Sequence, residues 1–329
     1  MTDIPDLADR ILAGDRRALA RAITLVESAR DDHREKAERL LGLLAGARRE
    51  ALRIGLSGTP GVGKSTFIEA FGTMLTGQGL KVAVLAVDPS SARSGGSILG
   101  DKTRMERLSR DPGAYIRPSP SQTSLGGVAR RTRDAVAICE AAGFDVVLIE
   151  TVGVGQSETM VAGMSDVFVL LLAPAGGDEL QGVKRGIMEL ADIVVVNKAD
   201  GDLKPAATRT AADYAGALAL IRKRSADAPG FPKVLLTSAH EGTGLKDVWN
   251  AVSELDAWRK DAGVKAALRS QQALAWFEEE VRLGLLARIT SDSTLRDCKE
   301  ELATAVSEGR LAPRSAAAEL LKTFDGKPR

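Results

Sequence analysis

The segment GTPGVGKST, residues 58 to 66, constrains the fold of this chain more than any other part of the sequence. It fits the pattern Gly-x-x-x-x-Gly-Lys-Ser, with Gly58 and Gly63 as its glycines, and it directly follows the apolar run LRIGLS. A glycine-rich turn between a strand and a helix lets backbone amides approach phosphate oxygens, and the helix N-terminus adds to the anion site. The segment therefore predicts a phosphate-binding loop in an α/β protein.

The residue types of this loop also predict which groups contact a nucleotide. We expect backbone amides of the loop to bind phosphate oxygens, Lys64 to reach the β- and γ-phosphates, and the Ser65 hydroxyl to ligate Mg²⁺. Thr66 is expected at the α-phosphate. The residues predicted to bind the phosphates are Gly61, Val62, Gly63, Lys64, Ser65 and Thr66.

Short apolar runs alternate with helical patterns between residues 51 and 260. The runs are LRIGLS, KVAVLAV, DVVLIE, DVFVLLL, DIVVVN and KVLLTS, with a further strand expected around 114–117. Continuous apolar runs of this kind indicate strands covered by helices on both faces, which is typical of a mostly parallel sheet. We predict an α/β P-loop NTPase domain over 51–260, an N-terminal helical extension over 1–50 and a C-terminal helical arm over 261–329.

The segment NKAD, residues 197 to 200, predicts recognition of guanine. Asp200 is expected to accept hydrogen bonds from guanine N1–H and N2–H, for which adenine has no matching donors. The segment TSAH, residues 237 to 240, follows the next expected strand and brings backbone groups toward guanine O6. The residues predicted to bind the base are Asn197, Lys198, Asp200, Ser238, Ala239 and His240. GTP and GDP are the expected substrate and product.

Three acidic residues, Asp88, Asp101 and Glu150, are predicted to surround Mg²⁺ together with Ser65. Asp88 and Glu150 end apolar runs that point to the phosphate edge of the sheet, whereas Asp101 lies in a Gly/Ser-rich loop. A loop cap or a solvated charge is the alternative interpretation for each acid. The sequence therefore predicts a magnesium-dependent nucleotide hydrolase.

The segment ETVGVGQSE, residues 150 to 158, predicts that hydrolysis is slow in the isolated protein. Gly153 is expected beside the γ-phosphate, but Val154 stands where many GTPases carry a glutamine that orients water. One candidate for the role of this missing glutamine is Gln156. Another is Lys184, in the Gly-rich segment 173–184. The alternative for that segment is an ordinary loop with helix-capping acids. The predicted catalytic residues are Lys64, Glu150, Gln156 and Lys184.

Composition disfavours several other classes of protein. A net charge of +1 and an aromatic content of 4% indicate no affinity for nucleic acid or anionic membranes. The apolar runs are shorter than the ~20 residues of a membrane helix, and the acidic start has no long apolar stretch, so we expect a cytoplasmic protein. Two cysteines without a Cys-x-x-Cys pair and two histidines disfavour a nickel-carrying metallochaperone.

Seven segments together resemble the MeaB/ArgK family, which are GTPase chaperones of adenosylcobalamin-dependent methylmalonyl-CoA mutase, similar to the human methylmalonic aciduria type A protein. The segments are GTPGVGKST, VDPSS, GDKTRM, SPSQTSLGGVAR, ETVGVGQSE, NKAD and SAHEGTG. The resemblance covers nearly the whole chain and marks residues 173–184 as a third switch. It implies a homodimer that uses GTP to protect the mutase and to gate cofactor loading. A metallochaperone-type GTPase and an arginine/ornithine transport-associated kinase remain as alternatives.

Residues 264 to 289 predict the surface that would make the dimer. Apolar side chains recur there at helical spacing, namely Leu268, Leu274, Phe277, Val281 and Leu285, widened by Ala273 and Trp276. The ~65 residues of the arm make only a marginal core alone, so pairing with a second copy would bury the stripe. Folding back onto residues 1–50 is the alternative.

Overall fold

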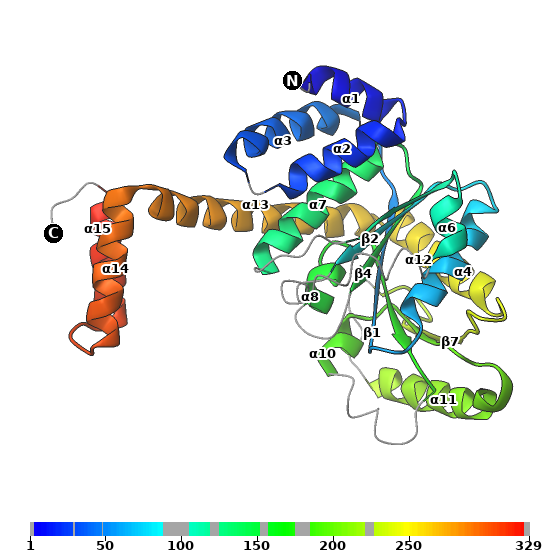
Figure 1. Cartoon of the computed structure of the whole chain (residues 1–329). Helices are drawn as coiled ribbons and strands as arrows, with labels where there is room; N and C mark the ends of the chain where they lie inside the picture. Colours follow the sequence, from blue (N-terminus) through cyan, green and yellow to red (C-terminus); the bar gives the residue numbers. More distant parts are fainter. Residues whose placement is uncertain are drawn as a thin grey trace. The chain divides into compact units, whose positions relative to one another are not determined.

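A computed structural model of the chain describes the residues 3–28, 30–47, 49–87, 105–118, 125–151, 157–174, 185–220 and 227–325. The chain separates into two compact units, residues 1–266 and residues 267–329, drawn together in Figure 1. The division into 1–50, 51–260 and 261–329 that the sequence suggests stays a prediction.

The first unit is built around a parallel sheet. Over the described ranges the sheet has seven strands in the order β3-β2-β4-β1-β5-β6-β7, and every neighbouring pair is parallel. The strands are β1 (Leu52–Gly58), β2 (Val82–Val87), β3 (Ala114–Arg117), β4 (Val146–Thr151), β5 (Val167–Leu172), β6 (Ile193–Val196) and β7 (Lys233–Leu236). The α/β class and the parallel sheet predicted from the apolar runs are confirmed.

Helices cover both faces of this sheet (Figure 1). On one face, α4 (Lys64–Thr76) and α12 (Leu245–Asp261) share an apolar core with strand residues such as Ile54 and Leu56. Gly55 points to the opposite face, because successive strand residues alternate. There a Cβ on Gly55 would lie 2.4 Å from Ser165 Oγ and 2.9 Å from Val161 Cγ1, so glycine lets α8 (Ser157–Ala162) approach β1 closely.

The remaining elements of the first unit complete these two layers. The helix α7 (Leu125–Ala141) contacts β2 and β4, and α11 (Lys204–Leu220) contacts β6 and β7. The shorter elements are η1 (Ala45–Ala47), α6 (Glu106–Arg110), α10 (Arg185–Leu190) and η3 (Gly201–Leu203).

The N-terminal helices α1 (Ile4–Leu12), α2 (Arg16–Glu27) and α3 (Asp31–Leu44) pack on one another and against α7 (Figure 1). The Asp15 carboxylate caps α2 by accepting hydrogen bonds from the backbone amides of Arg17 and Ala18 at 2.7 and 3.2 Å. The Arg16 guanidinium donates to the carbonyl oxygens of Pro112 and Ala114 at 2.7 and 2.6 Å. This arginine attaches α2 to the edge strand β3, so the N-terminal helices are part of the first unit.

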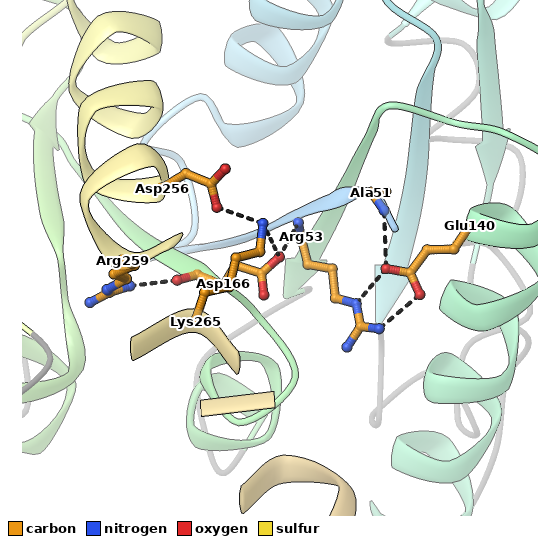
Figure 2. Close-up of polar contacts among 7 residues, drawn as sticks. All are labelled: Ala51, Arg53, Glu140, Asp166, Asp256, Arg259 and Lys265. Atoms are coloured by element: carbon orange, nitrogen blue, oxygen red, sulfur yellow. Dashed lines mark hydrogen bonds and ion pairs between the residues drawn. The ribbon is translucent and has the colours of Figure 1, made fainter. Parts of the chain in front are cut away.

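A network of buried and partly buried ion pairs joins elements at the edge of the sheet where β1 and β5 begin (Figure 2). The Arg53 guanidinium binds both carboxylate oxygens of Glu140 on α7 at 2.9 and 2.7 Å. The Arg53 amide donates to Asp166 Oδ2 at 2.9 Å. Lys265 Nζ, in the first turn of α13 (Val264–Ser291), lies 3.8 Å from Asp166 Oδ2 and 2.6 Å from Asp256 Oδ1. The start of α13 is therefore fixed to the sheet.

We expect Arg259→Leu to lower the free energy of unfolding by about 3 kcal/mol, because it removes the cation from a buried carboxylate. The Arg259 side chain is 4% exposed and binds both carboxylate oxygens of Asp192 at 2.6 and 3.1 Å, and it also donates to the Asp166 carbonyl. Urea unfolding followed by circular dichroism measures the change. Arg282→Leu is the control, since the pair of Arg282 with Glu279 is exposed. Equal decreases in the free energy of unfolding for both variants would show that the buried ion pair stabilises the fold no more than the exposed pair does.

The second unit is helical and small. The helices α14 (Ser293–Ser307) and α15 (Pro313–Phe324) pack through a cluster of Cys298, Leu302 and Ala316. The α13 side chains Leu274, Phe277, Val281 and Leu285 are exposed, and the exposed fractions of Leu274 and Phe277 are 61% and 65%. These four side chains of the predicted apolar stripe are therefore exposed, whereas Leu268 and Trp276 of the same stripe are half-buried. No helix in the described part is both long and apolar enough to cross a membrane.

Candidate nucleotide-binding site

The phosphate-binding loop connects β1 to α4 at the carboxyl ends of the parallel strands, where α/β sheets bind their ligands. Gly61 and Gly63 have φ angles of +84° and +90°, a region that favours glycine. A Cβ on Gly63 would also lie 2.9 Å from Asn197 Nδ2, so a side chain there would disturb a second predicted segment of the site. Both glycines are thus required by the loop itself.

Lys64 begins α4 and folds back over this loop. Its Nζ donates to the carbonyl oxygens of Gly58 and Thr59 at 2.7 and 3.3 Å. Ser65 is half-buried and Thr66 is exposed in the first helical turn, where unpaired backbone amides and the helix dipole favour an anion. This arrangement can bind phosphate with one ammonium group, a helix terminus and two hydroxyl groups.

Asn197 joins the three predicted segments. Its side chain follows β6 and is buried, and its Nδ2 donates to the Val62 carbonyl oxygen at 3.0 Å. Its Oδ1 accepts from the Ala239 amide at 3.0 Å and from Thr237 Oγ1 at 3.3 Å. The phosphate-binding loop, residues 197–200 and residues 237–240 are therefore adjacent. Because these protein groups occupy the Asn197 amide, the contact of Asn197 with guanine stays a prediction.

The remaining residues of the predicted base site lie around this junction. Lys198 has a φ angle of +59°, and its Nζ donates to the Gly61 carbonyl oxygen at 2.7 Å. Ser238 Oγ donates to Asp200 Oδ2 and accepts from the Glu241 amide at 3.0 Å. His240 is exposed. The Asp200 carboxylate is thus held at the carboxyl edge of β6 and β7, where a base would lie after its phosphates bind the loop.

Buried acids lie on the other side of the phosphate-binding loop. Glu150, near the end of β4, and Glu158, in the first turn of α8, are 3% and 2% exposed. Burial lowers the pKa of Lys64, whereas the charges of Glu150 and then Glu158 oppose this by raising it. Sequence reasoning missed Glu158, although it is the second acid of ETVGVGQSE. It also missed the hydrogen bond from Thr151 Oγ1 to Ser57 Oγ at 3.1 Å, which ties β4 to β1.

The described donors suit the predicted Mg²⁺. Ser65 supplies a hydroxyl and Glu150 a carboxylate, and hard oxygen donors are what this ion prefers, with water completing its shell. Five further residues of the predicted site lie outside the described residues, and their roles stay predictions. They are Asp88, Asp101, Gly153, Gln156 and Lys184.

Comparison with known proteins decides the family. A family model described as "Methylmalonyl Co-A mutase-associated GTPase MeaB" matches residues 19–294. The chain belongs to the MeaB family. Its relatives include a probable GTPase of Mycobacterium tuberculosis, 52% identical over 97% of this chain and 94% of that protein. A methylmalonic aciduria type A homolog of Mus musculus is 49% identical over 96% of this chain and 78% of that protein.

Two further proteins that are similar to this MeaB-family chain carry the name ArgK or the name of a transport system kinase. The GTPase ArgK of Escherichia coli is 43% identical over 94% of this chain and 93% of that protein. The crystal structure of a protein named LAO/AO transport system kinase superposes with a TM-score of 0.77 at 35% identity, covering 99% of both chains. The MeaB/ArgK resemblance and the P-loop fold that were predicted from the motifs are confirmed.

Proposed function

We propose that this MeaB-family GTPase is a chaperone of an adenosylcobalamin-dependent methylmalonyl-CoA mutase, protecting it and gating the loading of its cofactor. The observation that supports nucleotide use is the junction at Asn197, whose side chain hydrogen bonds to Val62 of the phosphate-binding loop and to Ala239 of the segment predicted to bind the base. The family description names a mutase-associated GTPase, and the mouse relative is named for methylmalonic aciduria, which supports the choice of partner.

The chain's own groups define how GTP would bind. Loop amides and Lys64 would bind the phosphates, Asp200 would accept from N1–H and N2–H of guanine, and exposed Lys198 would lie along the base. Ser65 and Glu150 would hold Mg²⁺, with Asp88 and Asp101 completing its carboxylate shell. When bound, Mg²⁺ neutralises negative charge on the β- and γ-phosphates.

Hydrolysis by the isolated protein would be slow because Val154 cannot orient water. We expect the partner mutase to raise the GTP turnover rate at least about tenfold, since a partner can order switch segments that deliver a missing catalytic group. Lys184→Ala should lower the stimulated rate about tenfold and spare the basal rate. Phosphate release with and without an adenosylcobalamin-dependent methylmalonyl-CoA mutase measures both rates.

Lys246→Ala is the matched control for this experiment, because Lys246 is an exposed lysine on α12, outside the proposed site. It should behave like the unmodified protein. A fast basal rate that no mutase changes would exclude the proposed switch. Pull-down of the mutase with GDP and with a non-hydrolysable GTP analogue tests the partner itself.

The partner proposal includes a second copy of this chain. The α13 stripe leaves Phe277, Leu274 and Leu285 in contact with water in the single chain, and a two-fold interface would bury the same stripe on both copies. This arm is the segment that we propose for dimerisation.

We expect the double variant Leu274→Asp, Phe277→Asp to weaken dimerisation at least about a hundredfold, because each charge replaces a buried apolar side chain. Sedimentation velocity measures the dissociation constant. Leu220→Asp is the control, since Leu220 is 89% exposed on α11. These substitutions are preferable to truncation after Gly263, which would also remove Lys265 and its partly buried ion pairs. A dimer that survives the double variant would place the interface elsewhere.

A second candidate function, an arginine/ornithine transport-associated kinase, is favoured by the similarity to the solved protein named LAO/AO transport system kinase. It requires transfer of the γ-phosphate to an acceptor other than water. Incubation with γ-labelled GTP or ATP and arginine or ornithine distinguishes the two functions. Label on the amino acid would support the kinase, and label only in free phosphate would support the GTPase.

A further inference from the structure

A cavity of about 430 Å³ lies among the N-terminal helices α1, α2 and α3, apart from the nucleotide-binding residues. Its apolar lining includes Ile4 and Leu7 of α1, both buried, and half-buried Leu25 of α2. Small-molecule sites usually have volumes of roughly 300–1,000 Å³ and are mainly apolar with a few polar groups. The cavity therefore has the size and lining of a site for a small organic molecule.

Apart from Thr24, the polar part of the lining is basic. Arg21, His33 and Lys36 line the cavity, and none of its lining residues is acidic. Arg21 is exposed and makes no hydrogen bond or ion pair within the described parts of the chain. Lys36 lies 3.4 Å from Asp32, but this carboxylate is shared with Arg30, which binds it at 2.8 and 3.1 Å. Positive charge at the cavity thus exceeds negative charge.

His33 is the third basic residue of the lining. Its Nε2 lies 3.9 Å from Asp32 Oδ2, whereas its Nδ1 is buried and has no hydrogen-bond partner among the residues that the structure describes. A buried polar atom without a partner costs free energy. Because Nδ1 is closed to water, His33 contributes the exposed part of its ring, and not this atom, to the cavity lining.

We propose that this cavity binds an amphiphilic organic anion, with its apolar body against Ile4, Leu7 and Leu25 and its anionic head at Arg21 and Lys36. A carboxylate and a phosphate monoester share the chemistry that a guanidinium and an ammonium recognise. A small molecule fits better than a protein helix, because a volume of about 430 Å³ accepts a single short chain rather than a helix about 10 Å wide.

Four probes with the same eight-carbon body test this site: octanoate, octyl phosphate, octan-1-ol and octylammonium. Isothermal titration calorimetry gives their affinities, and methyl NMR of the full chain shows whether Leu7 and Leu25 respond. We expect at least one anion to bind about tenfold more tightly than the alcohol, and the ammonium not to bind. The tighter of the two anions identifies the head group.

Variants separate this site from non-specific binding. Arg21→Ala should weaken the anion about fivefold and leave the alcohol unchanged, because only the anion uses the guanidinium. Ala20→Phe, which adds a ring to the cavity lining, should weaken every probe. Arg17→Ala is the control, since Arg17 is exposed on the same helix and does not line the cavity. GDP affinity, measured in the same samples, should stay unchanged and reports folding.

Several results would overturn the proposal. Anion and alcohol binding with equal affinity would remove the role of the basic residues. Binding that Ala20→Phe leaves intact would place the molecule elsewhere. If neither anion binds, but an acidic amphipathic peptide shifts the Leu7 and Leu25 methyl resonances, the site belongs to a protein partner and not to a small molecule.

Discussion

Asp200→Asn is expected to lower the affinity for GDP about a thousandfold and to create affinity for xanthosine diphosphate. The native carboxylate would accept two hydrogen bonds from guanine, at N1–H and N2–H. Asparagine can accept one of them, but its amide N–H groups oppose the guanine amino group. Xanthine carries oxygen at that position, so it accepts the new donor. Calorimetry with GDP, xanthosine diphosphate and ADP measures the change.

The surroundings of Asp200 indicate that this variant keeps its fold. Asp200 Oδ2 accepts from Ser238 Oγ, and an asparagine oxygen can accept the same hydrogen bond. Asp202→Asn is the matched control, because Asp202 is exposed in the adjacent η3 turn. It should retain GDP binding. If Asp200→Asn retains GDP affinity, or if the native chain binds ADP as tightly as GDP, the Asp200 carboxylate does not determine the specificity for guanine.

The sheet could be predicted from the sequence because each buried strand is a short, continuous apolar run. Strands such as VVLIET and VFVLLL are covered on both faces, so they carry few polar residues that would blur the pattern. The edge strand β7 is only half-buried, so its apolar pattern is less distinct, although it is also a short apolar run. The local composition of a strand is therefore sufficient to predict it where both of its faces are buried.

The candidate site could be predicted in part, because its residues occur in short segments whose spacing is fixed by strand ends. The hydrogen bonds that join these segments could not be predicted from the sequence. Asn197 donates to Val62, a residue 135 positions away, and this contact depends on the order in which β1 and β6 pair with β5. The ion pair of Arg259 with Asp192 and the cavity near His33 likewise arise from packing between distant segments. No local pattern encodes such contacts.

Lys64→Ala is expected to reduce GTP hydrolysis at least about a thousandfold, since a positive charge that binds the β- and γ-phosphates stabilises the transition state strongly. In this structure Lys64 Nζ binds the carbonyl oxygens of Gly58 and Thr59. Phosphates would draw the ammonium away from these carbonyls. Affinity for GTP should therefore fall together with turnover, measured by calorimetry and by phosphate release.

A second variant, Glu150→Gln, separates phosphate binding from metal binding. Glutamine keeps the size of a side chain that is 3% exposed, but it removes the carboxylate proposed for Mg²⁺ and the negative charge that acts on Lys64. GDP affinity without Mg²⁺ should therefore change less than about fivefold, whereas the Mg²⁺ concentration needed for hydrolysis should rise at least about tenfold. Lys81→Ala, an exposed lysine before β2, is the control for both variants. If Glu150→Gln hydrolyses GTP at the native rate and at the native Mg²⁺ concentration, a different acid lies beside the ion.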